Sequence, residues 1–168
     1  MFQDGYALKN SIPVYVSQDG TFKAMLFNGE YKMVHRDNNG PWVNKRDTVI
    51  VNVKGFTECQ YEVTPYYLVK NESFLISGNK LTATCKIEEI TSGKNISNVY
   101  LFINRTAFVD ESSTGNIAKI AVSKPSDPEN IKLEMDLTDH TEKNLYARIG
   151  VQINGVNDYL FSTVEKVK

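Results

Sequence analysis

The chain has 168 residues, with 19 basic and 20 acidic side chains and a net charge of −1. Its hydrophobic share of 41% and charged share of 23% are typical of a folded globular protein and exclude a disordered one. No run of basic residues is present, so the electrostatic footprint of a nucleic-acid-binding protein is missing. No apolar stretch approaches the roughly 20 residues that a membrane-spanning helix needs.

The first part of the chain predicts short strands joined by tight turns. Between residues 12 and 34, apolar and polar residues alternate on both sides of Asp19-Gly20 and Asn28-Gly29. These dipeptides favour hairpin turns, because both central residues of a type I′ turn need φ > 0. The segment therefore predicts three strands, and residues 48–54 and 59–63 predict two more. We expect a first β-sandwich domain at residues 1–65, without helices.

The second part of the chain predicts longer and more regularly spaced strands. Seven strands, at intervals of roughly 8–12 residues or slightly more, are typical of an immunoglobulin-like or fibronectin-like sandwich. The tryptophan and cysteine pattern of antibody domains is absent, which favours the fibronectin III-like variety. We expect a second β-sandwich domain at residues 66–168. Its predicted strands are 67–76, 81–90, 99–103, 118–122, 131–137, 145–153 and 156–164.

The residues that most often carry catalysis or hold metals form no recognisable set. His35 and His140 are far apart and have no partner at metal-ligand spacing. The segment Asp37-Asn38-Asn39-Gly40 resembles part of a calcium loop, but the bidentate glutamate at the required spacing is missing, so an ordinary Asx-rich turn is favoured. There is no nucleophile elbow and no phosphate loop. We predict no enzyme activity, no cofactor and no metal.

The two cysteines alternate with apolar neighbours. Cys59 shares a predicted strand face with Tyr61, and Cys85 shares one with Ala83 and Ile87. Free cysteine behaves as a small hydrophobic residue, so we expect two buried thiols. A disulfide between Cys59 and Cys85 is the alternative, and it would have to join the two predicted domains.

The aromatic residues of one polar loop and of the domain junction are the candidates for ligand binding. An exposed ring can stack on the apolar face of a sugar, while neighbouring polar groups bind its hydroxyls. The structural alternatives are that the loop tryptophan caps the first core and that the junction tyrosines hold the domains together. The candidate binding residues are Trp42, His35, Arg36, Asp37, Asn39, Tyr66 and Tyr67.

Four segments together resemble a Bacteroidetes-type family of unknown function. They are residues 12–34, NGPW at 39–42, DTVIVNVKG at 47–55 and VTPYY at 63–67. The resemblance implies an all-β protein with an amino-terminal carboxypeptidase regulatory-like, transthyretin-type sandwich and a carboxy-terminal immunoglobulin-like sandwich. It implies no catalytic residues.

The same resemblance implies a location and a role. Family members are found among the surface lipoproteins of starch-utilisation-system-like glycan loci, so we expect a lipid-anchored protein at the outer membrane and cell surface. The family implies a signal peptide and a lipid-bearing cysteine upstream, so we expect this chain to be a trimmed form. The first functional hypothesis is an accessory protein that binds polysaccharide or oligosaccharide for an outer-membrane importer. The second is a spacer or docking module of the importer assembly, without a ligand of its own.

Overall fold

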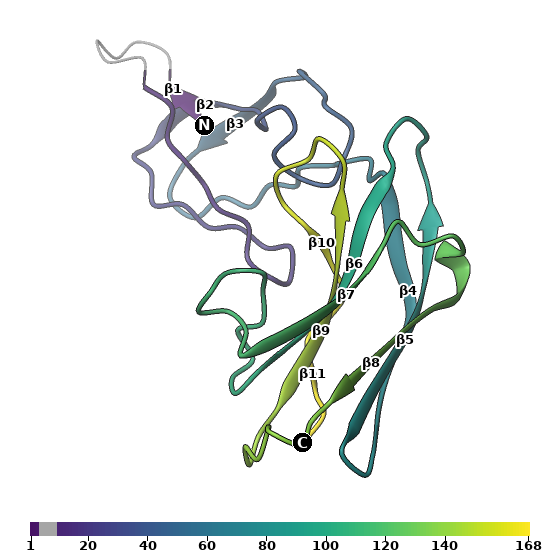
Figure 1. The fold of residues 1–168 in the computed structure, drawn as a ribbon. Helices are drawn as coiled ribbons and strands as arrows, with labels where there is room; N and C mark the ends of the chain where they lie inside the picture. Colours follow the sequence, from purple (N-terminus) through teal and green to yellow (C-terminus); the bar gives the residue numbers. More distant parts are fainter. Residues whose placement is uncertain (4–9) are drawn as a thin grey trace. The chain divides into compact units, whose positions relative to one another are not determined.

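The computed structural model describes residues 1–3 and 10–168. Contacts within the chain divide it into two units (Figure 1). The first unit comprises Met1–Asp37 and Asn44–Val63, and the second comprises Asn38–Val43 and Thr64–Lys168. The short segment Asn38–Val43, which we call the strap, thus belongs to the second unit although it lies between two parts of the first.

The first unit contains one antiparallel three-stranded sheet in the order β1-β2-β3. Strand β1 spans Phe2–Gln3, β2 spans Gly29–Met33 and β3 spans Val49–Val53. Alternate residues of β2 and β3 face the same side, as the period of two in a strand requires. They form a small core of four buried side chains: Tyr31, Met33, Val51 and Val53.

The prediction of three strands in residues 12–34 is wrong for two of the three. Within that range only β2 is a strand, and the Asp-Gly turn is closed by an isolated bridge between Val16 and Phe22. The Asp19 carboxylate accepts bonds from the Thr21 N–H and hydroxyl at 3.0 and 2.7 Å. Such local side-chain bonds compete with a strand ladder. The strand predicted at residues 59–63 is also absent, because the alternating Cys59 and Tyr61 pack on the core without pairing to a neighbour.

The second unit is a sandwich of two antiparallel sheets, ordered β10-β9-β6-β7, with β11 also pairing with β9, and β4-β5-β8 (Figure 1). The predicted strands are found here, except that the last one, 156–164, is reduced to the two residues of β10, and β11 follows beyond it. A single 3-10 turn, η1, leads into β8, and no other helix occurs among the described residues. The elements are β4 Tyr67–Ser77, β5 Lys80–Glu89, β6 Ile96–Asn104, β7 Ala118–Ser123, η1 Pro128–Asn130, β8 Ile131–Asp136, β9 Tyr146–Ile153, β10 Leu160–Phe161 and β11 Glu165–Lys166.

The core of the second unit follows from strict alternation along its long strands. In β5, Leu81, Ala83, Cys85 and Ile87 are buried, and every second residue of β6, β8 and β9 faces them. Burial of each large aliphatic side chain stabilises the fold by about 1.5–3 kcal/mol. This core is much larger than that of the first unit, so the second unit is the rigid scaffold for any site on it.

The all-β, two-domain sandwich class predicted from the sequence is confirmed. Both cysteines are free thiols, so the alternative of a disulfide does not apply. Burial raises the pKa of Cys85 to about 12, whereas Cys59 is only half-buried. Within residues 1–3 and 10–168, no helix has the length and apolarity to cross a membrane.

Candidate functional site

Three of the predicted binding residues lie in the first unit, and their polar groups already have protein partners or face solvent. His35 Nδ1 lies 2.8 Å from the Tyr61 hydroxyl, and Nε2 accepts the Lys45 N–H at 2.9 Å. Asp37 forms an ion pair with Arg46 at 2.8 Å. Arg36 is exposed. Both ring nitrogens of His35 are therefore used to hold a loop.

Trp42 and Asn39 lie in the strap of the second unit. The Trp42 indole is half-buried and folds back over Gly40, where an added Cβ would lie 2.1 Å from the ring. Asn39 Nδ2 donates to Asp158 at 2.6 Å, and burial raises the pKa of that carboxyl. One face of Trp42 is therefore occupied by its own turn, and Asn39 is used to fix the strap.

Tyr66 and Tyr67 are core residues rather than exposed platforms. Their exposed fractions are 8% and 6%, and both belong to the main cluster of the second unit. The Tyr66 N–H donates to the Pro41 carbonyl at 3.1 Å, and its own carbonyl accepts from Ile90. Tyr67 donates its hydroxyl to the Lys94 carbonyl. Tyr67 also lines a pocket.

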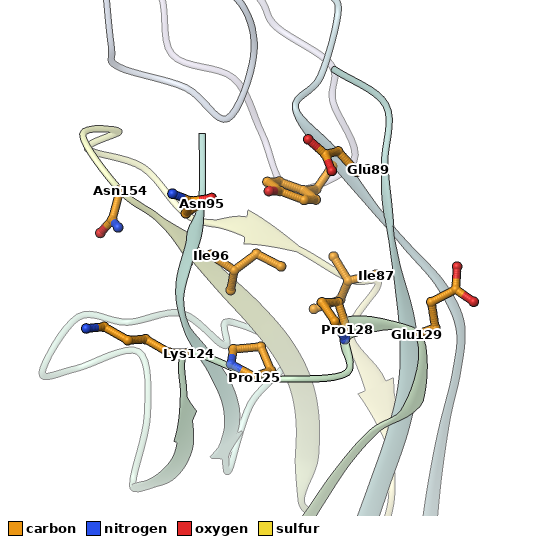
Figure 2. Close-up of a pocket in the computed structure, with 10 residues that line it drawn as sticks. Ile87, Glu89, Asn95, Ile96, Lys124, Pro125, Pro128, Glu129 and Asn154 are labelled. Atoms are coloured by element: carbon orange, nitrogen blue, oxygen red, sulfur yellow. The ribbon is translucent and has the colours of Figure 1, made fainter. Parts of the chain in front are cut away.

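That pocket lies within the second unit, where strand ends of both sheets meet, and has a volume of about 630 Å³ (Figure 2). Such a volume is within the range of ordinary ligand pockets. Its lining mixes aliphatic and proline surfaces with carboxylate, amide, phenol and ammonium groups. The lining residues are Tyr67, Ile87, Glu89, Asn95, Ile96, Lys124, Pro125, Pro128, Glu129 and Asn154.

One wall of the pocket is a row of three polar residues at the end of the larger sheet. Asn95 immediately precedes β6, while Lys124 follows β7 and Asn154 follows β9, the two strands that flank β6. The Asn154 N–H donates to the Asn95 carbonyl at 2.9 Å, and the Lys124 N–H donates to the Ser97 carbonyl at 2.8 Å. Because neighbouring strands lie roughly 4.8 Å apart, the row spans roughly 10 Å.

The opposite wall comes from the smaller sheet and from η1. Figure 2 shows Glu129 and Ile87 across the pocket from Lys124 and Asn154. Glu129 forms an ion pair with Lys86 at 2.9 Å, and this hydrogen bond raises the pKa of the lysine. Burial, with a smaller contribution from the nearby Glu89 charge, raises the pKa of Tyr67. Because the phenol donates its proton to the Lys94 carbonyl, its oxygen can accept a hydrogen bond from a ligand.

The arrangement provides polar groups around an apolar floor. The amides of Asn95 and Asn154 and the ammonium of Lys124 make no side-chain hydrogen bond to any residue within the described ranges. They are free to bind hydroxyl or anionic groups of a ligand. The described residues contain no cluster of three or more His, Cys, Asp or Glu side chains that could hold a metal ion.

The sequence does not single out this wall, because its residues have the ordinary pattern of strand ends. Asn154-Gly155 is a typical hairpin turn, Pro125 ends a strand, and Asn95 lies in a turn. A signal was present, since successive connections of an antiparallel sandwich alternate between its two ends. Turns two strands apart in the chain therefore meet at the same end, although the sequence alone does not give the strand order.

A second feature, a cluster of aromatic rings, lies on the outer face of the larger sheet. Tyr100 stacks on Phe102 with ring centroids 5.3 Å apart, and Tyr159 stacks on Phe161 at 5.8 Å. The rings of Phe102 and Phe161 cover Gly150, where an added Cβ would lie 2.7 Å from the former. Because Phe102 is fully buried by such packing, we interpret the cluster as a small outer core.

The comparisons with known proteins agree with the fold. Residues 1–64 match the protein of unknown function (DUF3823) N-terminal domain, and residues 67–166 match the domain of unknown function (DUF3823_C). A DUF3823 family protein from Parabacteroides merdae is 41% identical, with a TM-score of 0.89 over 99% of this chain and 84% of that one. A family protein from Bacteroides ovatus is 37% identical, with a TM-score of 0.86 over 99% and 85%.

A more distant structure shares the fold alone. It is a protein from Bacteroides uniformis that is named, as a proposal, a carbohydrate-binding protein. Its sequence is 20% identical to this one, and the TM-score is 0.70 over 92% of this chain and 81% of that chain. No curated protein matches. The two domain matches together extend over nearly the whole sequence, and the chain belongs to the DUF3823 family.

Proposed function

We propose that this protein is a non-catalytic saccharide-binding accessory protein and that the pocket of the second unit is its binding site. The observation that carries the proposal is the pocket lining. The amides of Asn95 and Asn154, which make no side-chain hydrogen bond to the described residues, and the phenol oxygen of Tyr67 surround a floor of proline and isoleucine side chains. Sugars present hydroxyls and apolar C–H faces, which suit a pocket that offers both polar groups and apolar surface.

The distant Bacteroides uniformis structure supports the proposal only through its name, since the likeness is one of fold. The resemblance to glycan-locus lipoproteins supports a cell-surface, lipid-anchored location and an outer-membrane importer as partner. It also supports a regulatory-like type for the first domain and an immunoglobulin-like type for the second. All of these features belong to the proposal.

Isothermal titration of the full chain against a library of oligosaccharides and polysaccharides tests saccharide binding. Asn95→Ala and Asn154→Ala should each weaken binding of a positive glycan by about two- to tenfold, the worth of one or two neutral hydrogen bonds. Asn144→Ala, in an exposed loop away from the pocket, is the control and should leave affinity unchanged. The absence of binding across the library would refute the proposal.

The proposal that the protein does not cleave its ligand is tested separately. The purified chain should leave every glycan of the same library intact during prolonged incubation, as product analysis by mass spectrometry would show. Hydrolysis that disappears in Glu89→Gln would instead make the pocket an active site.

A docking role remains the second candidate, because the first unit exposes large apolar side chains. Phe27 and Phe56 are 84% and 90% exposed, and Met25 is exposed as well. Asn28 Oδ1 accepts the Gly55 N–H at 2.9 Å, which brings their two turns together. Exposed apolar patches of this kind mark interaction surfaces. If docking is the function, no saccharide should bind, and Phe27→Ser with Phe56→Ser should abolish co-purification with importer components.

A further inference from the structure

We infer that the pocket selects saccharides that carry a carboxylate, and that Lys124 is the residue that determines this specificity. The inference rests on the proposed function, because it names the class of ligand for the same pocket. It goes further in assigning the charge of the ligand and the residue that recognises that charge.

Lys124 lacks the acidic partner that the lysines of the smaller sheet have. Lys70, Lys80, Lys86 and Lys132 of that sheet each form an ion pair with a glutamate of β5, β8 or η1. Lys124 lines the pocket and forms no ion pair with any residue in the described part of the chain. Its ammonium is therefore available to an anion from outside.

The backbone of Lys124 is fixed in an uncommon conformation. Its φ is 44°, in the left-handed region that non-glycine residues seldom adopt. The following Pro125 restricts it further, and the Lys124 N–H is bonded to the Ser97 carbonyl. Non-glycine residues in such regions cluster at ligand-binding sites, where the surrounding structure holds them. The root of the Lys124 side chain is thus placed beside the pocket before any ligand arrives.

The neighbours of Lys124 complete a site for a carboxylate attached to a hydroxyl-bearing ring. Asn95 and Asn154 stand in the same row and can donate N–H bonds to the carboxylate or to adjacent oxygens. The negative side chains are Glu129, whose charge is matched by Lys86, and Glu89, which Figure 2 places away from Lys124. Glu89 can accept hydrogen bonds from sugar hydroxyls. The end of the pocket at Lys124 therefore favours the carboxylate of an acidic sugar, and the end at Glu89 favours its hydroxyls.

Matched pairs of ligands test the inference on the full chain. Short oligosaccharides of galacturonate, glucuronate, mannuronate and guluronate are titrated beside their methyl esters, which keep the ring and remove the charge. Lys124→Gln removes the charge of the side chain, and Lys124→Arg keeps it. Lys143→Gln, an exposed lysine in the β8–β9 loop without an ion pair among the described residues, is the control.

We expect at least one acid to bind about tenfold more tightly than its ester, the usual worth of a hydrogen bond to a charged group. Lys124→Gln should remove that advantage, Lys124→Arg should retain it within about threefold, and Lys143→Gln should leave it unchanged. The advantage should also shrink in 1 M salt, because the ammonium is at the surface.

The other outcomes distinguish a failure of the carboxylate assignment from a failure of saccharide binding itself. Equal affinity for acid and ester, or preference for neutral sugars, would overturn the inference while leaving saccharide binding intact. Tighter binding of sulfated than of carboxylated sugars would overturn the carboxylate assignment. Acid binding that is unaffected by Lys124→Gln would exclude Lys124. Failure of every saccharide would refute the proposed function, and the inference with it.

Discussion

The indole of Trp42 lies against the Cα of Gly40, and this contact decides what the residue can do. An added Cβ at Gly40 would come within 2.1 Å of the ring, so no other residue fits there without displacing it. The sequence pattern NGPW predicted a turn and an aromatic side chain, and both are present. It could not predict that the ring would fold onto the turn, because that depends on the path of the strap.

Gly40→Ala should force the indole away from the turn and destabilise the second unit by about 1–3 kcal/mol, the usual cost of overpacking. Because Trp42 is the single tryptophan of the sequence, its fluorescence reports the displacement directly. We expect a red shift of emission and an earlier urea transition. Ser77→Ala, an exposed substitution at the end of β4 in the same unit, is the control and should leave the emission unchanged. Unaltered emission in Gly40→Ala would show that the ring does not lie on the turn.

Glu134 illustrates how surface charge affects this fold. Hydrogen bonds from Lys132 and Lys80, at 2.7 and 3.2 Å, lower its pKa below the ordinary value of 4.5. A lowered carboxyl pKa stabilises the folded state above the unfolded value, and this contribution is lost as the pH falls through the folded value.

Glu134→Gln should therefore lower the melting temperature slightly at pH 7, by an amount that is smaller in 1 M salt. The difference from the wild type should shrink as the pH falls below 4.5 and vanish once Glu134 is protonated in both states. Melting curves by circular dichroism between pH 7 and pH 3 measure it. A difference that persists unchanged at pH 3 would assign the effect to packing rather than to charge.

At the scale of elements, β6 shows that one strand serves two cores. Val99, Leu101 and Ile103 face the inside of the sandwich, whereas Tyr100 and Phe102 join the aromatic cluster on the outer face. A glycine inside a strand weakens it, and aromatic rings packed over the glycine compensate for the missing side chain. The rings over Gly150 in β9 fill this role.

Phe102→Ala should cost about 3–5 kcal/mol of the free energy of unfolding, as for other fully buried phenylalanines. The matched control is Phe108→Ala, in the loop after β6, where the side chain is 75% exposed. That change should stay within about 0.5 kcal/mol. Urea denaturation followed by circular dichroism measures both. Similar small effects of the two substitutions would show that the outer cluster does not stabilise the sheet.

The elements that the sequence predicted well are those whose alternation reflects burial in a two-sheet core. In β5 and β8, every second residue is apolar and buried, and the observed bounds lie within one residue of the predicted ones. Residues 12–28 alternate as well, and Ile12, Phe22 and Leu26 pack against the first core while Tyr15, Met25 and Phe27 are exposed. The alternation there reflects one core-facing side without pairing into strands, and a single sequence does not show which alternating segments also pair.

The candidate pocket was less predictable than the strands for a geometric reason. Its walls come from residues as distant in sequence as Tyr67 and Asn154. They meet only because β7 and β9 flank β6 and because η1 leads from one sheet to the other. The predicted site, by contrast, combines residues of one loop, 35–42, with Tyr66 and Tyr67, and the structure divides these residues between two units.

At the scale of the whole molecule, the strap joins the second unit through backbone hydrogen bonds. The Val43 N–H donates to the Thr64 carbonyl at 2.8 Å. The N–H groups of Asn157 and Asp158 donate to the carbonyls of Asn38 and Asn39 at 2.9 and 2.7 Å. Opening of the strap therefore breaks hydrogen bonds of the second unit, although the segments on either side of the strap belong to the first unit.

Amide hydrogen exchange by mass spectrometry should show this division of the chain. We expect the strap to exchange as slowly as the loops of the second unit, and more slowly than the segments on either side of it, because opening free energies follow cooperative units rather than sequence. Asn39→Ala removes the bond to Asp158 and should speed exchange in the strap by about tenfold, while β2 and β3 keep their rates. Ser11→Ala, an exposed change in the first unit, is the control. If Asn39→Ala instead accelerates exchange in β2 and β3, the strap opens with the first unit, and the division into two units is wrong at this segment.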